Sequence, residues 1–392
     1  MIFRQHMDLG KSIILRWQLL IFLILGFLYG CYAPEDQPGS TDTPARGNRY
    51  ARGFSIEQDI DFKILHVQDP WQGSSGIHLE YVLAAEGTHI PDSLAGIPVI
   101  KTPVSRVICM STTHVAMISA LGMTETIVGV SGPDYISNPS VRQGISAGRV
   151  LDVGADQSLN YERILTLRPD LVMAYGVTAE ISGMVGRLEE LGIPVILNAD
   201  YLENEPLGKT EWLKFIAALY NKGREADSIF ESIAARYEGY RELAAETELR
   251  PRVITGLPWK DAWYVPGGKS FAAAFIRDAG GDYVWNDMDR RDATPIDLES
   301  VYAKGADSDF WINSGSAGNL EDILQTESRL IRFKPYRDGS VYNNTGRMNR
   351  TGGNDFWETG VMEPDIILAD LIAIFHPEIF PGYELRYYRQ LQ

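Results

Sequence analysis

The chain contains 392 residues, of which 45% are hydrophobic and 22% are charged, and this balance excludes wholesale disorder. The length is too great for one ordinary domain and predicts two lobes of roughly 100–200 residues each. A net charge of −16 repels phosphate backbones and excludes nucleic acid as the expected partner, while two cysteines are too few for a disulfide framework or a Cys-based zinc site.

Residues 1–30 have the features of an export signal. Three basic residues, Arg4, Lys11 and Arg16, precede an apolar run from Leu19 to Tyr29. As a helix this run would rise only ~16 Å, about half the thickness of the hydrocarbon core of a bilayer. We therefore interpret it as the apolar segment of a signal peptide rather than a transmembrane span.

The apolar run ends in Leu28-Tyr29-Gly30-Cys31, which resembles a lipobox, the cleavage and lipidation site of bacterial lipoproteins. We expect Cys31 to carry the lipid; the alternative is an ordinary signal peptide followed by a coincidental cysteine. Residues 31–52 are polar and proline-rich, which predicts a flexible tether. The protein is thus expected to be exported and lipid-anchored to the cell envelope, on the periplasmic face or the cell surface.

Residues 53–103 favour strands. Apolar residues nearly alternate over 62–67 and alternate cleanly over 77–83, and the segment between them, Asp69–Gly76, is typical of a hairpin turn. This pattern predicts a small β-rich extension preceding the first lobe.

Residues 104–206 predict the first α/β lobe, in which buried strands alternate with helices. Strands are expected at 104–110, 126–130, 171–175 and 194–197, and helices at 112–121, 160–167 and 178–191. Such alternation is typical of a parallel, doubly wound sheet.

Residues 207–249 form a helical linker with an expected break at 221–223. Its second part, 224–249, is long enough to act as a rigid strut between lobes. Residues 250–392 repeat the alternation, with strands expected at 253–257, 262–265, 310–313 and 341–344 and helices at 270–279, 297–304, 319–326 and 364–375. The predicted fold is therefore α/β: two doubly wound lobes joined by a single long helix, with a ligand cleft between them.

The sequence offers no convincing nucleophile–base pair and no histidine spacing typical of a metal site. His114 follows the first strand of this lobe, and we interpret it as a structural histidine. The interpretation is a protein that is not an enzyme and has no metal or cofactor of its own.

Aromatic and polar residues cluster where strands end, which is where open α/β sheets bind ligands. The expected ligand-binding residues are Asp134, Tyr135, Tyr175, Trp259, Arg347, Arg350 and Trp357. Aromatic side chains suit a large, flat ligand, and arginines suit an anionic one. Tryptophans also fill cores: we expect this of Trp285 and Trp311, while Trp259 and Trp357 are open to either interpretation.

Several stretches together resemble the substrate-binding proteins of ABC importers for iron chelates, haem and vitamin B12. They are Arg106–Ser111, Ile127–Ser131, Asn160–Ile164, Arg168–Val172, Leu191–Val195, Ala279–Gly281 and Asp297–Glu299, and the resemblance covers roughly residues 104–376. It implies two α/β lobes joined by a long helix, with little hinge closure. It also implies partnership with a membrane permease and its ATPase.

The resemblance further assigns roles to individual residues. Glu162 and Glu299, each two residues after an expected N-cap, match the acidic positions that dock on the permease. Tyr175 and Trp259 match positions that face the ligand in B12-binding members. Asp156 and Ala293 stand where those members have tryptophans, and these two departures weaken the case for vitamin B12 as the ligand.

Three functional hypotheses remain. The leading one is delivery of an iron chelate, a siderophore complex or haem, to an ABC permease. The alternative with the same fold is cobalamin binding. A third, from another class, is an exported enzyme of chelatase-like fold in which His114 would act with a carboxylate.

Overall fold

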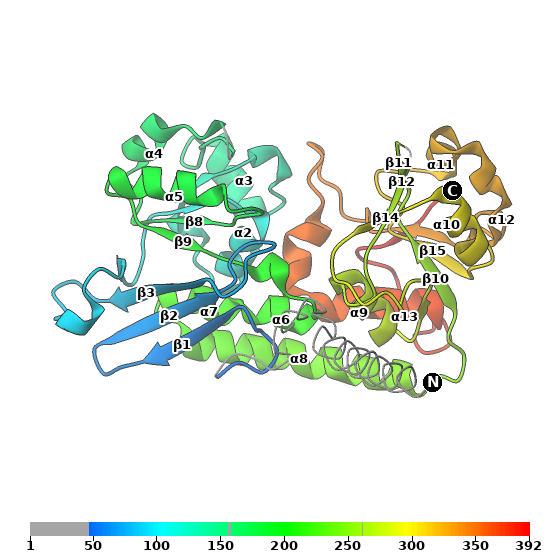
Figure 1. The fold of residues 1–392 in the computed structure, drawn as a ribbon, viewed down its shortest axis with the longest axis horizontal. Coiled ribbons are helices and arrows are strands. Elements are labelled where there is room, and N and C mark those ends of the chain that lie inside the picture. Colours follow the sequence, from blue (N-terminus) through cyan, green and yellow to red (C-terminus); the bar gives the residue numbers. More distant parts are fainter. Residues whose placement is uncertain (1–46, 156–157, 261) are drawn as a thin grey trace, which may run out of the picture. The chain divides into compact units, whose positions relative to one another are not determined.

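A computed structural model describes residues 47–155, 158–260 and 262–392 (Figure 1). The expected signal peptide, Cys31, most of the expected tether and Asp156 lie outside the described residues.

The amino-terminal extension is a four-stranded sheet in the order β1-β2-β3-β4. Its strands are β1 (Phe54–Gln58), β2 (Phe62–Gln68), β3 (His78–Ala84) and β4 (Val99–Lys101). The hairpin expected between 62 and 83 is confirmed, because β2 and β3 pair antiparallel. Alternation directs Leu65 and Tyr81, which face each other across the pair, into the core.

The first lobe contains a fully parallel sheet in the order β7-β6-β5-β8-β9. The strands are β5 (Val107–Cys109), β6 (Ile127–Val130), β7 (Leu151–Asp152), β8 (Leu171–Ala174) and β9 (Val195–Leu197). The helices are α2 (Thr112–Ala120), α3 (Pro139–Ser146), α4 (Tyr161–Leu167) and α5 (Ile181–Glu190). The strands and helices expected in this lobe are confirmed, although most are shorter than predicted, and α3 was not predicted.

The linker consists of α6 (Pro206–Glu211), α7 (Leu213–Leu219) and α8 (Gly223–Ala245). The predicted break is confirmed: Asn221 has a left-handed φ of 56° between α7 and α8. The long helix ends at Ala245, a few residues earlier than predicted, and α8 packs against both α7 and α13 (Pro364–Phe375).

The second lobe is built on a sheet in the order β13-β10-β15-β16-β17. The strands are β10 (Arg252–Thr255), β13 (Asp282–Tyr283), β15 (Phe310–Ile312), β16 (Val341–Asn343) and β17 (Arg389–Gln390). Only the β16–β17 pair is antiparallel. The helices are α9 (Phe271–Asp278), α10 (Leu298–Gly305), α11 (Leu320–Thr326), α12 (Lys334–Arg337) and α13.

The strand predicted at 262–265 forms, as β12 (Ala262–Val265), but it does not join the parallel sheet. It pairs antiparallel with β11 (Pro258–Trp259) and β14 (Thr294–Ile296) in a separate three-stranded sheet. Trp263 and Val265 are buried while Tyr264 between them is exposed. This alternation is typical of an antiparallel sheet with one solvated face.

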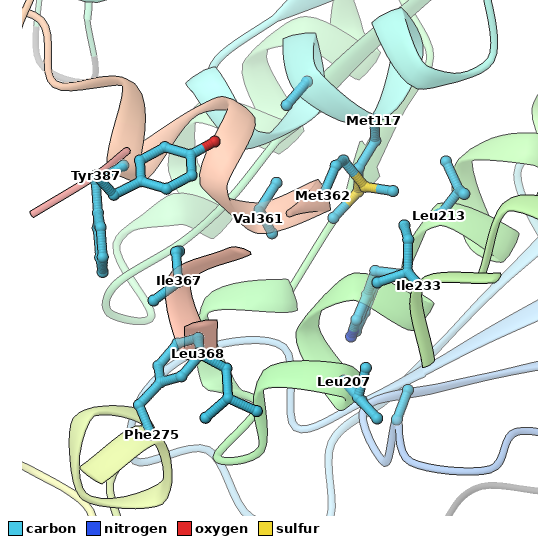
Figure 2. Close-up of a cluster of buried hydrophobic side chains, with 14 of the residues drawn as sticks. Met117, Leu207, Leu213, Ile233, Phe275, Val361, Met362, Ile367, Leu368 and Tyr387 are labelled. Carbon is cyan, nitrogen blue, oxygen red and sulfur yellow. The ribbon is translucent and has the colours of Figure 1, made fainter. Parts of the chain in front are cut away.

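One hydrophobic core runs through both lobes and the linker. Met117 of α2, Leu213 of α7 and Ile233 of α8 belong to the same cluster as Met362, Leu368 and Phe275 of the second lobe. Figure 2 shows Met117 and Met362 side by side in this cluster, with Leu213 and Ile233 beside them. The two lobes are therefore joined by packed apolar side chains as well as by α8.

Candidate functional site

An aromatic pair lies where two strands of the first lobe end. Tyr175 directly follows β8, and Tyr201 lies four residues after β9. Their rings meet edge to face, with centroids 6.2 Å apart and planes inclined by 70°. The Tyr201 hydroxyl donates to the Gly176 carbonyl at 2.6 Å. Tyr201 was not among the predicted site residues, although its position just after a strand could have indicated it.

A hollow of about 430 Å³ opens beside Tyr175. It is lined by Tyr161, Tyr175, Gly176, Val177, Thr178, Glu180, Ile181 and Met184, from the first turn of α4 to α5. It lies at the carboxyl end of β8. Ligands of parallel α/β sheets bind at this end of the strands.

The three-stranded sheet contributes a second aromatic pair, in the other lobe. Trp259 is 61% exposed and Tyr264 is 44% exposed, and their rings lie 6.2 Å apart. The ammonium group of Lys260 lies 4.2 Å from the centroid of the Trp259 ring. Lys260, which was not predicted, therefore adds positive charge to an exposed aromatic surface.

Trp285 and Trp311 are buried, which confirms their predicted core role, whereas Trp357 is 52% exposed. His114 is fully buried in α2, where burial lowers the pKa of its imidazole to about 3. It is therefore neutral at physiological pH.

A loop of the second lobe reaches across to the first. We call residues 345–358 the brace loop. The Asn349 amide donates to the carbonyls of Asp134 (3.1 Å) and Ile136 (3.0 Å), and the Thr351 hydroxyl donates to Asp134 at 2.6 Å. A Cβ at Gly353 would lie 2.4 Å from the Tyr135 carbonyl, so only glycine permits this approach. The structure thus brings Asp134 and Tyr135 together with the loop that carries the predicted arginines.

The two predicted arginines have different environments. The Arg347 guanidinium forms an ion pair with buried Asp355, with an Nε–Oδ2 distance of 2.6 Å. Burial alone would lower the pKa of Arg347, but the hydrogen bond and charge of Asp355 raise it above the ordinary value. Arg350 is exposed and has no ion pair or hydrogen bond with any other described residue. A ligand could therefore bind Arg350 without disrupting an ion pair, whereas binding to Arg347 would compete with Asp355.

Glu358 at the end of the brace loop is buried between the lobes. Its carboxylate accepts hydrogen bonds from the backbone N–H groups of Ser137 (2.6 Å) and Asn138 (2.8 Å), just before α3. Burial raises its pKa to about 7 despite these two bonds. The neighbouring Trp357 carbonyl accepts a bond from the Thr112 hydroxyl at 3.0 Å. Nothing in the local sequence indicated this contact.

Glu162 and Glu299 occupy equivalent positions in the two lobes. Each is exposed in the first turn of a helix, α4 or α10. The N-caps expected before them form: Asn160 accepts from the Arg163 N–H and Asp297 from the Ser300 N–H. Ala293, where the resemblance implied a departure, is exposed in the loop before β14.

Across residues 47–155, 158–260 and 262–392, no group of three or more His, Cys, Asp or Glu side chains is arranged to hold a metal ion. Within the same ranges, none of the helices has the length and apolarity needed to cross a membrane.

The family model of the periplasmic binding proteins matches residues 107–343, well over half of the chain. This chain belongs to that family. The match confirms the resemblance to substrate-binding proteins of ABC importers that was drawn from the sequence, and the two-lobed α/β fold with it. Because the family is a non-enzymatic transport component, the hypothesis of a chelatase-like enzyme is wrong.

Relatives of this periplasmic binding protein include lipoproteins and a vitamin-binding protein. An uncharacterized lipoprotein of Methanocaldococcus jannaschii is 28% identical over 300 residues, 74% of this chain and 69% of the relative. The vitamin B12-binding protein of Salmonella typhimurium is 28% identical over 242 residues, 61% of this chain and 84% of that protein.

Solved structures of low sequence identity share the fold. A periplasmic heme-binding protein from Pseudomonas aeruginosa has a TM-score of 0.56 and 18% identity, covering 74% of this chain and 98% of its own. An ABC-type Fe3+-hydroxamate transport protein from Saccharomonospora viridis has a TM-score of 0.51 and 20% identity, covering 70% and 94%. At these identities the likeness establishes the fold alone.

Proposed function

We propose that this chain is the substrate-binding lipoprotein of an ABC importer that captures an iron chelate, either a siderophore complex or haem. The observation that carries the proposal is an exposed aromatic pair with a lysine ammonium group beside it, together with a second aromatic pair in the other lobe. Trp259 and Tyr264 lie beside Lys260 in one lobe, and Tyr175 and Tyr201 form the aromatic pair of the other. Flat faces suit a macrocycle or catecholate, and the cations suit its negative charge.

The same proposal includes delivery and anchoring. Cys31 would hold the protein to the cell envelope, outside the cytoplasm, through a lipid. Glu162 and Glu299 would bring the loaded protein to basic residues of the permease, which works with its ATPase. Both glutamates are exposed at the start of a helix, so their carboxylates are accessible to a partner.

Cobalamin is the second candidate ligand. The relative from Salmonella typhimurium that binds vitamin B12 aligns over 84% of its length, and the aromatic pairs would serve a corrinoid as well. A corrinoid would depend on the rings and would be indifferent to the cations.

Tryptophan fluorescence distinguishes these ligands. We would titrate residues 44–392 with haem, a ferric hydroxamate, ferric citrate and cyanocobalamin, correcting for inner-filter absorption. Saturable quenching that weakens in the Trp259→Phe variant, and not in a buried-site Trp285→Phe control, is the expected result. Quenching by cyanocobalamin alone would make cobalamin the ligand. No response to any of the four would refute this ligand class.

Charge removal separates the two candidates a second time. The double variant Lys260→Ala/Arg350→Ala should weaken an anionic chelate by about tenfold or more, because a charge-assisted hydrogen bond contributes roughly 1.5–3 kcal/mol. The matched control Arg149→Ala/Arg332→Ala also removes two exposed cations, outside the strand ends and the brace loop. Equal affinities in the two double variants would contradict an anionic ligand.

A further inference from the structure

The amino-terminal β-sheet precedes the segment that matches the family, residues 107–343, yet one of its turns reaches the first lobe's aromatic pair. The backbone N–H of Gln72, between β2 and β3, donates to the Tyr201 hydroxyl at 3.1 Å. Figure 1 shows this turn, in blue, beside the green segment that leads into α6.

The turn is held in one conformation by its own hydrogen bonds. At the two ends of the turn, the Asp69 N–H donates to the Ile77 carbonyl at 2.8 Å. Within the turn, the Ser74 N–H donates to the Trp71 carbonyl at 3.0 Å. Gly73 has a φ of 80°, the value at the third position of a type II turn. Trp71 packs its ring against the core of the first lobe, which fixes the turn to that lobe.

Tyr201 connects the turn to the end of β8, and the residue after it contacts the second lobe. Its hydroxyl donates to Gly176, the residue after Tyr175, while its ring meets the ring of Tyr175 edge to face. The next residue, Leu202, accepts a hydrogen bond at 3.0 Å from the guanidinium of Arg291 in the second lobe. The turn therefore lies where the two lobes meet, and not on a remote face of the extension.

We propose that the turn at residues 69–77 belongs to the ligand site as a positioning element. The Gln72 backbone fixes the Tyr201 hydroxyl, and Tyr201 in turn holds the Tyr175 ring and the Gly176 corner in the orientation that receives the ligand. Gln72 and Tyr201 are positioning residues, and the inference rests on the proposed function.

A proline scan tests the backbone bond directly. Gln72 is the second residue of a type II turn, where proline is favoured, so Gln72→Pro removes the N–H donor while preserving the turn. Gln72→Ala keeps the donor and removes only the side chain. Glu86→Pro is the matched control: Glu86 holds the same position in the Ala85–Thr88 turn, which has a Thr88–Ala85 hydrogen bond and a φ of 83° at Gly87.

Affinity would be measured on the detergent-solubilised full chain, with whichever of haem, ferric hydroxamate, ferric citrate or cyanocobalamin the wild type binds most tightly. Gln72→Pro should bind about fivefold more weakly, the size of one lost neutral hydrogen bond. Gln72→Ala and Glu86→Pro should match the wild type. Tyr201→Phe should weaken binding at least as much, and adding Gln72→Pro to it should have no further effect.

Two outcomes would overturn the inference while leaving the proposed function intact: unchanged affinity in a folded Gln72→Pro variant, or an equal loss in Glu86→Pro. If Gln72→Pro does not fold, Tyr201→Phe decides alone. A wild-type chain that binds none of the four ligands would refute the proposed function, and the inference with it.

Discussion

A single carboxyl group in the brace loop links the contact between the lobes to pH. Glu358 is almost fully buried, faces Asp355 and Arg142, and accepts two backbone hydrogen bonds at the start of α3. Its pKa is raised by burial to about 7 in the folded protein, against an ordinary value of 4.5. Between these values the folded chain holds a proton that the unfolded chain has released. Because of Glu358, the free energy of unfolding therefore falls as pH rises from about 4.5 to about 7.

Glu358→Gln should remove this dependence, because an amide does not titrate. Urea denaturation at pH 5 and pH 7.5 should show a smaller change in the free energy of unfolding for the variant than for the wild type. The difference between the two changes should be on the order of 2 kcal/mol. Glu242→Gln, on an exposed face of α8, should keep the wild-type dependence. Parallel pH profiles for Glu358→Gln and wild type would show that the carboxyl does not titrate in this window.

At the scale of elements, α4 and α10 present matching acidic turns, one in each lobe. Glu162→Lys together with Glu299→Lys should abolish uptake by cells while leaving ligand affinity within about twofold, since neither residue lies among the strand-end aromatic residues. Uptake would be followed with radiolabelled iron or cobalt in cells that depend on this importer.

The control for docking is a second charge reversal of equal size. Glu125→Lys with Glu384→Lys also changes one exposed glutamate in each lobe but leaves the two helix starts intact. Because lysine in a first turn destabilises a helix by about 0.3–1 kcal/mol, thermal unfolding of both double variants would be compared. Uptake that survives Glu162→Lys/Glu299→Lys would contradict the docking assignment.

The sequence predicted elements well where periodicity was strong and less well where folding depends on distant contacts. The helix Pro364–Phe375 and the strand Ala262–Val265 have the predicted bounds, because their apolar spacing alone defines them. Helix α3 was missed because it buries only Val141 and Gly144, too few residues for a periodic signal. The pairing of β12 with β14 was missed because pattern predicts a strand but not its partner.

The same limit applies to the candidate site. Trp259 and Trp357 were predicted from their positions after strands or in loops, and both are exposed. Tyr201 and Glu358 could not be predicted from the sequence, because their partners, Gln72 and Ser137, are far away in the chain. Lys260 directly follows Trp259, but the sequence does not show that its ammonium group lies over the indole ring. A free arginine and an ion-paired one, Arg350 and Arg347, are indistinguishable in sequence because the pairing with Asp355 depends on how the loop folds.

At the scale of the whole described unit, α8, the brace loop and the shared apolar core all join the lobes, and so does the hydrogen bond from Arg291 to the Leu202 carbonyl. Separating the lobes by a hinge would expose Met117, Met362 and their neighbours to water and break the hydrogen bonds of Asn349 and Glu358. Exposing apolar surface costs roughly 25 cal/mol per Å², so a wide opening is unfavourable. This packing gives a physical basis for the limited closure that the family resemblance implied.

Spin labels placed in the two lobes test this rigidity. Cysteines at Arg149 and Asp338, both exposed, would carry the labels, since Cys109 is buried and unreactive by comparison. We expect the distance distribution from double electron–electron resonance to shift by less than about 2 Å on adding saturating ligand. Removing the contacts of the brace loop with Asn349→Ala and Glu358→Ala should broaden the distance distribution of the ligand-free protein. The mean distance between the labels should stay near that of the wild type, because the shared apolar core still joins the lobes. A large ligand-induced shift in the wild type would mean that the shared core repacks during binding and that the lobes close as hinged bodies.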